Sequence, residues 1–289
     1  KANIKDEDRT INKLKDLLGN IDNIRKLFDN SFKSTFRNYT SSYIVFLDSI
    51  DDVTLKEQYI KLNKELNHEI QENVKTNNKS DRQNKNWATM KELKEIVDNY
   101  KKELDKNKSL KKEELTKKEF NILQKYVIGS LYVGDPKDNP PVRNDYVMDI
   151  INIKDYNKLS EKQKEDKNYL VIKNKSNKFF SFGKYKTFDT YGIKHIKVGQ
   201  HINKILNIWL KYNKSNHLFL DSLGQPINSN KISKLLYRVF EPSNKKISSS
   251  LIRNIYISET FPPQSKERKE VADKMLHSVD VQSTNYAKN

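Results

Sequence analysis

The chain has 289 residues, a formal net charge of +17 at pH 7 and no cysteine. This length suggests two domains, and the lack of cysteine excludes disulfides, thiolate nucleophiles and cysteine-based zinc sites. The positive charge favours a polyanionic partner because neutralised phosphates release counterions, although a Lys/Asn-rich composition from an A/T-biased genome supplies much of the same charge. The five histidines show no metal-ligand spacing, and no apolar run approaches the roughly 20 residues of a membrane span. We therefore expect an intracellular protein without metal, cofactor or membrane anchor.

Residues 1–75 are predicted to form three or four short helices. Apolar residues recur at three- and four-residue steps within 11–28, 32–47 and 55–70, and almost no Gly or Pro interrupts them. Residues 76–86 contain no apolar residue, which is typical of a linker. The sequence thus predicts a helical first domain, 1–75, joined by a linker, 76–86, to a second domain, 87–289.

The second domain begins with helical spacing from Trp87 to Leu104. A capping-box pattern at Thr116 and Glu119 then predicts a helix that runs to about Tyr132. After that point the spacing of apolar residues changes from the helical period, and short strands are predicted at 169–172, 178–182 and 193–198. Helical patterns return at 201–213, 229–240, 247–260, 265–276 and from about 280. The predicted fold class is mainly α with a small antiparallel β-sheet.

Six polar residues in this second domain stand out as candidates for chemistry. His277 precedes Tyr286 by nine positions on a polar, helix-compatible stretch near the carboxyl end. Further upstream, an arginine follows two prolines, a lysine lies in a Tyr-Lys-Thr segment beside the predicted sheet, and a second arginine lies three residues after a serine. These four residues are Arg143, Lys186, Arg253 and Ser250.

Together these side chains match the needs of a tyrosine that attacks a phosphodiester. The five-coordinate phosphorus carries extra negative charge, and two guanidinium groups suit it because each is permanently charged and offers a planar fork of donors. A lysine or histidine can protonate the departing 5′-oxygen, and the tyrosine can hold the phosphoryl group covalently until religation. This chemistry requires no metal.

The order Arg143, Lys186, Ser250-x-x-Arg253, His277, Tyr286 resembles the catalytic domain of the tyrosine recombinase (phage-type integrase) family. Residues 140–146, Pro-Pro-Val-Arg-Asn-Asp-Tyr, look like the branch found in eukaryotic mobile elements and large DNA viruses or virophages. The resemblance covers roughly residues 83–289. Residues 1–75 are similar only in kind to the family's core-binding domain, which clamps DNA.

The chain departs from the family pattern at two positions. Ser250 stands where the family usually has histidine, and Asn254 stands where it often has histidine. Serine donates a hydrogen bond to a phosphate oxygen but does not act as an acid or base near neutral pH. The lysine assignment also has an alternative, because Lys184 lies close to Lys186 beside the same predicted sheet.

The resemblance implies a site-specific recombinase that acts on double-stranded DNA through a covalent 3′-phosphotyrosine. Four protomers on two DNA sites would carry out strand exchange, and the protein would work where DNA is found. Two alternatives remain: a type IB topoisomerase-like enzyme, which shares the catalytic residues, and a non-catalytic DNA-binding protein on a recombinase scaffold, which Ser250 would favour.

Overall fold

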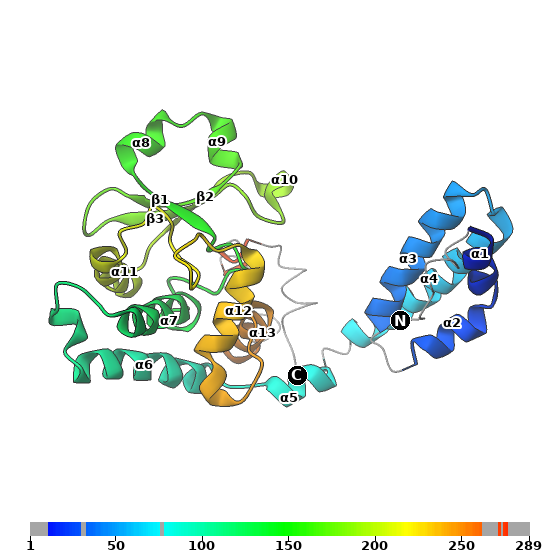
Figure 1. Ribbon diagram of the computed structural model, residues 1–289, viewed down its shortest axis with the longest axis horizontal. Helices are drawn as coiled ribbons and strands as arrows, with labels where there is room; N and C mark the ends of the chain where they lie inside the picture. The colour runs from blue at the N-terminus through cyan, green and yellow to red at the C-terminus, as the bar shows by residue number, and fades with distance from the viewer. Residues whose placement is uncertain (1–10, 30–32, 76–77, 262–270, 273, 277–289) are drawn as a thin grey trace. The chain divides into compact units, whose positions relative to one another are not determined.

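The structure of the protein is a computed structural model, and it describes residues 11–29, 33–75, 78–261, 271–272 and 274–276. Contacts divide the chain into two compact units, Lys1–Asn78 and Lys79–Asn289. Figure 1 shows the elements of each unit. None of the described helices is long and apolar enough to cross a membrane.

Four helices make up the described part of the first unit: α1 (Ile11–Gly19), α2 (Ile21–Leu27), α3 (Lys33–Ser49) and α4 (Val53–Lys75). α3 and α4 pair through a tight turn in which Asp51 has a φ of 53° and the Asp52 side chain caps α4 at Leu55. Tyr59 is fully buried on α4, and its hydroxyl donates to the carbonyl of Leu18 at 2.8 Å. The apolar stripes predicted for this region therefore face one small core.

The second unit begins with α5 (Asp81–Asn86), within the segment predicted as a linker. Ser80 and Gln83 form a capping box that starts this helix, and Asn86 accepts a hydrogen bond from the amide of Lys246 at 2.6 Å. A segment without apolar residues is thus held by polar contacts, which the hydrophobic pattern does not detect.

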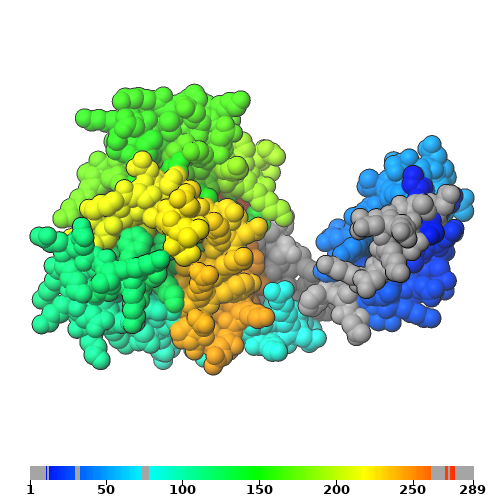
Figure 2. All heavy atoms as spheres, viewed as in Figure 1, coloured from blue at the N-terminus to red at the C-terminus, as the bar shows by residue number. Residues whose placement is uncertain are grey.

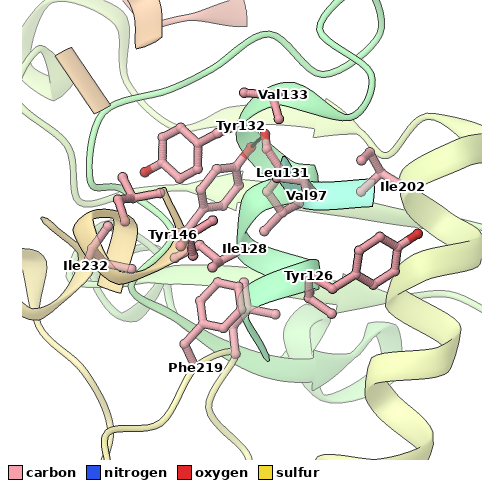
Figure 3. Packing of buried hydrophobic residues seen from close by; sticks show 14 of the residues in the cluster. Val97, Tyr126, Ile128, Leu131, Tyr132, Val133, Tyr146, Ile202, Phe219 and Ile232 are labelled. Atoms are coloured by element: carbon pink, nitrogen blue, oxygen red, sulfur yellow. Dashed lines mark hydrogen bonds between the residues drawn. The ribbon is translucent and has the colours of Figure 1, made fainter. Parts of the chain in front are cut away.

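Two long helices, α6 (Met90–Lys106) and α7 (Lys117–Val133), follow α5 and are joined through the 3₁₀ turn η2 (Ser109–Lys111). Most residues of α7 are buried, and at Gly129 an added Cβ would lie 2.5 Å from the side chain of Val97 on α6. Figure 3 shows α7 residues packing against Tyr146 and Phe219, with the rings of Tyr132 and Tyr146 edge to face at 5.4 Å. α7 is therefore the centre of the unit's core.

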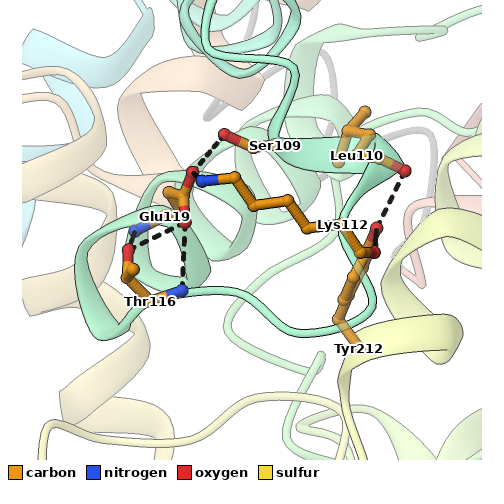
Figure 4. A network of polar contacts seen from close by, with 6 residues as sticks. All are labelled: Ser109, Leu110, Lys112, Thr116, Glu119 and Tyr212. Carbon is orange, nitrogen blue, oxygen red and sulfur yellow. Dashed lines mark hydrogen bonds and ion pairs between the residues drawn. The ribbon is translucent and has the colours of Figure 1, made fainter.

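The capping box predicted at Thr116 and Glu119 is confirmed, and it extends into a larger polar network (Figure 4). The Glu119 carboxylate accepts hydrogen bonds from Lys112 at 2.6 Å, from Ser109 at 2.6 Å and from the amide and hydroxyl of Thr116. These donors lower the pKa of Glu119 to about 2. The network fixes the connection between α6 and α7.

A four-stranded sheet in the order β1-β2-β3-β4 lies on α7 and α11. Its strands are β1 (Met148–Asn152), β2 (Asn168–Ile172), β3 (Lys178–Phe182) and β4 (Lys194–Lys197). The expectation of a purely antiparallel sheet is wrong, because β1 pairs with β2 in parallel while the other pairs are antiparallel. Two short helices, α8 (Ile153–Lys158) and α9 (Glu161–Glu165), return the chain between the parallel strands, as such a pair requires.

Side chains alternate between the two faces of this sheet. Leu170 and Phe180 join the main core with α7, whereas Tyr169 and Val171 form a smaller cluster with Tyr156 of α8. Figure 1 shows α8 and α9 on one side of the sheet and α11 and α7 on the other. The sheet is consequently covered on both faces.

The remaining helices are α10 (Phe188–Tyr191), α11 (Gln200–Tyr212), α12 (Ser229–Val239), the 3₁₀ turn η3 (Glu241–Ser243) and α13 (Ser249–Thr260). Of these, α11, α12 and α13 agree with the helical patterns predicted at 201–213, 229–240 and 247–260, whereas α10 was not predicted. The predicted helix at 265–276 is described only in part, and the one from about 280 lies outside the described residues. A mainly helical chain with one small sheet is therefore confirmed.

Candidate active site

Arg143 lies in the loop between α7 and β1, two positions after Pro141. Its backbone carbonyl accepts a hydrogen bond of 2.6 Å from the hydroxyl of Tyr132, which is fully buried on α7. The side chain is half-buried, and its Nη1 is buried without a hydrogen-bond partner among the described residues. A buried donor in this state requires an explanation, and a bound ligand would supply one.

Ser250 and Arg253 lie one turn apart on α13, whose first turn is capped by the Ser248 side chain. Arg253 is 3% exposed, whereas Ser250 is exposed, and the Nη2 of Arg253 lies 3.4 Å from the Ser250 hydroxyl oxygen. Asn254 is also buried in this helix. The residue three positions before Arg253 is thus next to the guanidinium, as the spacing implies.

Asn144 fastens the Arg143 loop to both neighbouring helices. Its amide nitrogen donates to Ser233 Oγ at 2.9 Å and to the Ser229 carbonyl at 3.1 Å, both on α12. Its amide oxygen accepts from the hydroxyl of Ser249, on α13, at 2.7 Å. The single side chain that follows Arg143 therefore sets the loop against the helix that carries Arg253.

Both arginines are close enough to Asp145 for their charges to influence its carboxyl group. Burial raises the pKa of the Asp145 carboxyl to about 6, while the positive charges of Arg143 and Arg253 both act to lower it. Two guanidinium groups from segments far apart in the chain therefore act on the same carboxyl group.

The candidate lysines lie in the turn between β3 and α10. Lys184 and Lys186 are both exposed, and neither side chain forms a hydrogen bond or ion pair with another described residue. The turn packs closely against the segment that contains Lys164. A Cβ added at Gly183 would lie 1.8 Å from the carbonyl oxygen of Lys164, so only glycine fits there. The choice between the two lysines stays open.

Asn168, at the start of β2, connects this lysine turn to the arginine loop. Its amide nitrogen donates to the carbonyls of Asp145 at 2.9 Å and Lys184 at 3.0 Å. Its amide oxygen accepts from the backbone amides of Gly183 at 3.1 Å and Lys184 at 2.8 Å. The structure thus brings the lysine turn and the arginine loop together through one buried side chain.

His277 and Tyr286 lie outside the described residues. The last described residue, Leu276, is buried with a φ of 61°, and its carbonyl accepts a hydrogen bond of 2.7 Å from Thr187. Thr187 follows Lys186 directly. The residue before His277 is therefore held beside the lysine turn.

Sequence reasoning identified Arg143, Ser250 and Arg253, which the structure brings together, but it did not identify the residues that position them. Asn144 and Asp145 directly follow Arg143, and Asn168 is the one polar residue in an otherwise apolar strand. A polar side chain at the start of a buried strand needs hydrogen-bond partners, and this need was the available signal.

The described residues contain no group of three or more His, Asp or Glu side chains that could hold a metal ion. Searches of family models, of curated proteins and of solved structures found no match to this chain.

Proposed function

We propose that the protein is a site-specific DNA recombinase that cleaves and rejoins DNA strands through a covalent 3′-phosphotyrosine. The observation that carries this proposal is the hydrogen bond of 2.7 Å from Ser249 to Asn144, which fastens the loop of Arg143 to the helix of Arg253 although the two arginines are over a hundred residues apart. The charges of both arginines also act on the carboxyl group of Asp145. Two guanidinium groups at one place suit the negative charge that develops on a phosphoryl group in transfer.

In the proposed reaction, the Tyr286 oxygen attacks the scissile phosphorus and the bond from phosphorus to the 5′-oxygen breaks. The departing 5′-oxygen takes a proton from Lys186 or His277, and the phosphoryl group stays on the tyrosine as a 3′-phosphodiester. The 5′-hydroxyl of a partner strand then attacks this intermediate and releases the tyrosine. The Ser250 hydroxyl, beside Arg253, donates a hydrogen bond to a phosphate oxygen.

The test is covalent capture on DNA. The protein is incubated in EDTA with a pool of nicked duplexes that have random centres, denatured with SDS, and the adducts are isolated and sequenced. We expect SDS-resistant adducts that share a sequence, and we expect none with Tyr286→Phe. Adducts formed on every sequence by one protomer would indicate a topoisomerase instead.

Arg143→Lys and Arg253→Lys test the two arginines on the captured sequence. Loss of one preorganised donor costs about 3–4 kcal/mol, so each variant should cleave about 10²–10³ times more slowly. Thermal melting checks that the variants fold. Absence of any adduct from a folded, DNA-binding wild-type protein would refute the proposed chemistry and favour a DNA-binding scaffold.

A further inference from the structure

A hollow of about 320 Å³ lies beside Ser250, between α5 and the beginning of α13. Its lining includes Arg82, Gln83 and Asn86 from α5 and Lys246, Ser250 and Asn254 from the α13 side. In Figure 2 the cyan atoms of α5 lie against the orange atoms of the segment that leads into α13. The hollow therefore joins the candidate active site to the first residues of the second unit.

The walls of this hollow are fixed by hydrogen bonds between segments about 160 residues apart. The amide of Lys246 donates to the Asn86 side chain at 2.6 Å, and the Lys245 ammonium donates to the Trp87 carbonyl at 2.6 Å. Near the end of α13, the carboxylate of Glu259 accepts a hydrogen bond of 3.1 Å from the backbone amide of Met90. The short helix α5 is thus held in place against α13.

The charge of the lining distinguishes this hollow from three other hollows in the described part of the second unit. Among the described residues that line it, the two charged side chains, Arg82 and Lys246, are both cations and none is a carboxylate. Each of the other hollows includes at least one aspartate, such as Asp149 or Asp221. Two cations surrounded by amides and a hydroxyl fit an anion with several acceptor oxygens, and an arginine fork suits a phosphate in particular.

We propose that this hollow binds a phosphate of the DNA backbone adjacent to the phosphate held by Arg143 and Arg253. The inference rests on the proposed function, because that function places DNA at the site. Ser250 lines the hollow and also lies 3.4 Å from Arg253, so it stands between the two phosphates. Helix α5 then belongs to the DNA interface through Arg82. A bound DNA strand is held at two neighbouring phosphates, one on each side of Ser250.

Salt-dependent binding to duplex DNA tests the proposal without knowledge of the target sequence. The dissociation constant is measured over a range of salt concentrations for the wild-type protein, for the Arg82→Gln/Lys246→Gln double variant and for Lys204→Gln, a control exposed on α11. Loss of one phosphate contact should reduce the slope of log K against log salt by about 0.9. Each lost cation should weaken binding at low salt by up to about fivefold. The control should match the wild-type protein.

Two unrelated duplex sequences separate a phosphate contact from a base contact. Equal losses on both duplexes support a phosphate site, whereas a loss on only one overturns it in favour of base recognition. A double variant that melts like the wild-type protein yet keeps its salt slope also overturns the phosphate site, while the proposed function stands. If the wild-type protein does not bind DNA at all, the proposed function fails, and this inference fails with it.

Discussion

Asn144→Ala removes the side chain that fastens the arginine loop to α12 and α13. Three hydrogen bonds are lost, two from the amide nitrogen to Ser229 and Ser233 and one to the amide oxygen from Ser249. At about 1 kcal/mol each, they sum to about 3 kcal/mol. Because Asn144 is only half-buried, water can replace part of this, and we expect a loss of about 2 kcal/mol in the free energy of unfolding.

Urea unfolding followed by tryptophan fluorescence measures this loss in the second unit alone. The chain has two tryptophans, Trp87 and Trp209, and both belong to that unit. Asn157→Ala, at an exposed position of α8, is the matched control and should change stability by less than about 0.5 kcal/mol. Asn144→Asp keeps an acceptor for Ser249 and should fall between the wild-type protein and the alanine variant.

A loss below about 0.5 kcal/mol for Asn144→Ala, with an unchanged urea dependence, would refute the reasoning. It would mean that the loop keeps its position without these bonds and that other contacts hold Arg143. If capture on DNA succeeds, the same variant should cleave more slowly than the Asn157→Ala control, because the loop sets Arg143 relative to Arg253.

Three further changes test the packing and charge of the same unit. Gly183→Ala places a Cβ against the carbonyl of Lys164 and should cost about 3 kcal/mol in urea unfolding, whereas a neutral effect would show that the turn can move. Glu119→Gln removes a carboxylate whose pKa is lowered to about 2. The melting temperature of the wild-type protein should exceed that of the variant by its full amount above about pH 4.5, and this difference should disappear as the pH falls towards 2. A pH-independent difference would contradict this assignment. Burial lowers the pKa of Lys178, whose ammonium donates to neutral oxygens of Lys175, Asn203 and Asn207. The stability of the wild-type protein relative to Lys178→Met should therefore rise as the pH increases towards 10.5. A stability difference that does not change with pH would exclude such a shift.

The sequence predicted the longer helices because their apolar stripes and caps are local signals, whereas the short helices α5, α8, α9 and α10 were missed. The Thr116 and Glu119 capping box is one case, and the stripe on α11 is another. β1 was missed because Asp149 and Asn152 interrupt its apolar pattern and because its parallel partner lies beyond α8 and α9, so the pairing depends on contacts distant in the chain. The same limit applies to α5, whose attachment to Lys246 involves no hydrophobic signal.

The candidate site divides in a similar way. Arg143, Ser250 and Arg253 could be predicted from residue type and order, and the structure places them together. For Asn168 the one available signal was a polar side chain at the start of an apolar strand. The role of Asn144 could not be predicted, because nothing in the sequence distinguishes it from an asparagine in a surface turn. Their importance depends on what lies across the fold from them.

The two junctions of the candidate site, Asn144 and Asn168, are amides and not ionised groups. A scaffold built on carboxylates would neutralise the guanidinium charges next to it, whereas an amide holds the backbone in place without opposing them. Burial raises the pKa of Asp145 to about 6, so this carboxyl group is mostly ionised at pH 7 and offsets part of the positive charge of Arg143 and Arg253. The two asparagines therefore hold the loop and the strand in place without adding further negative charge, and the remaining positive potential is available to a bound anion.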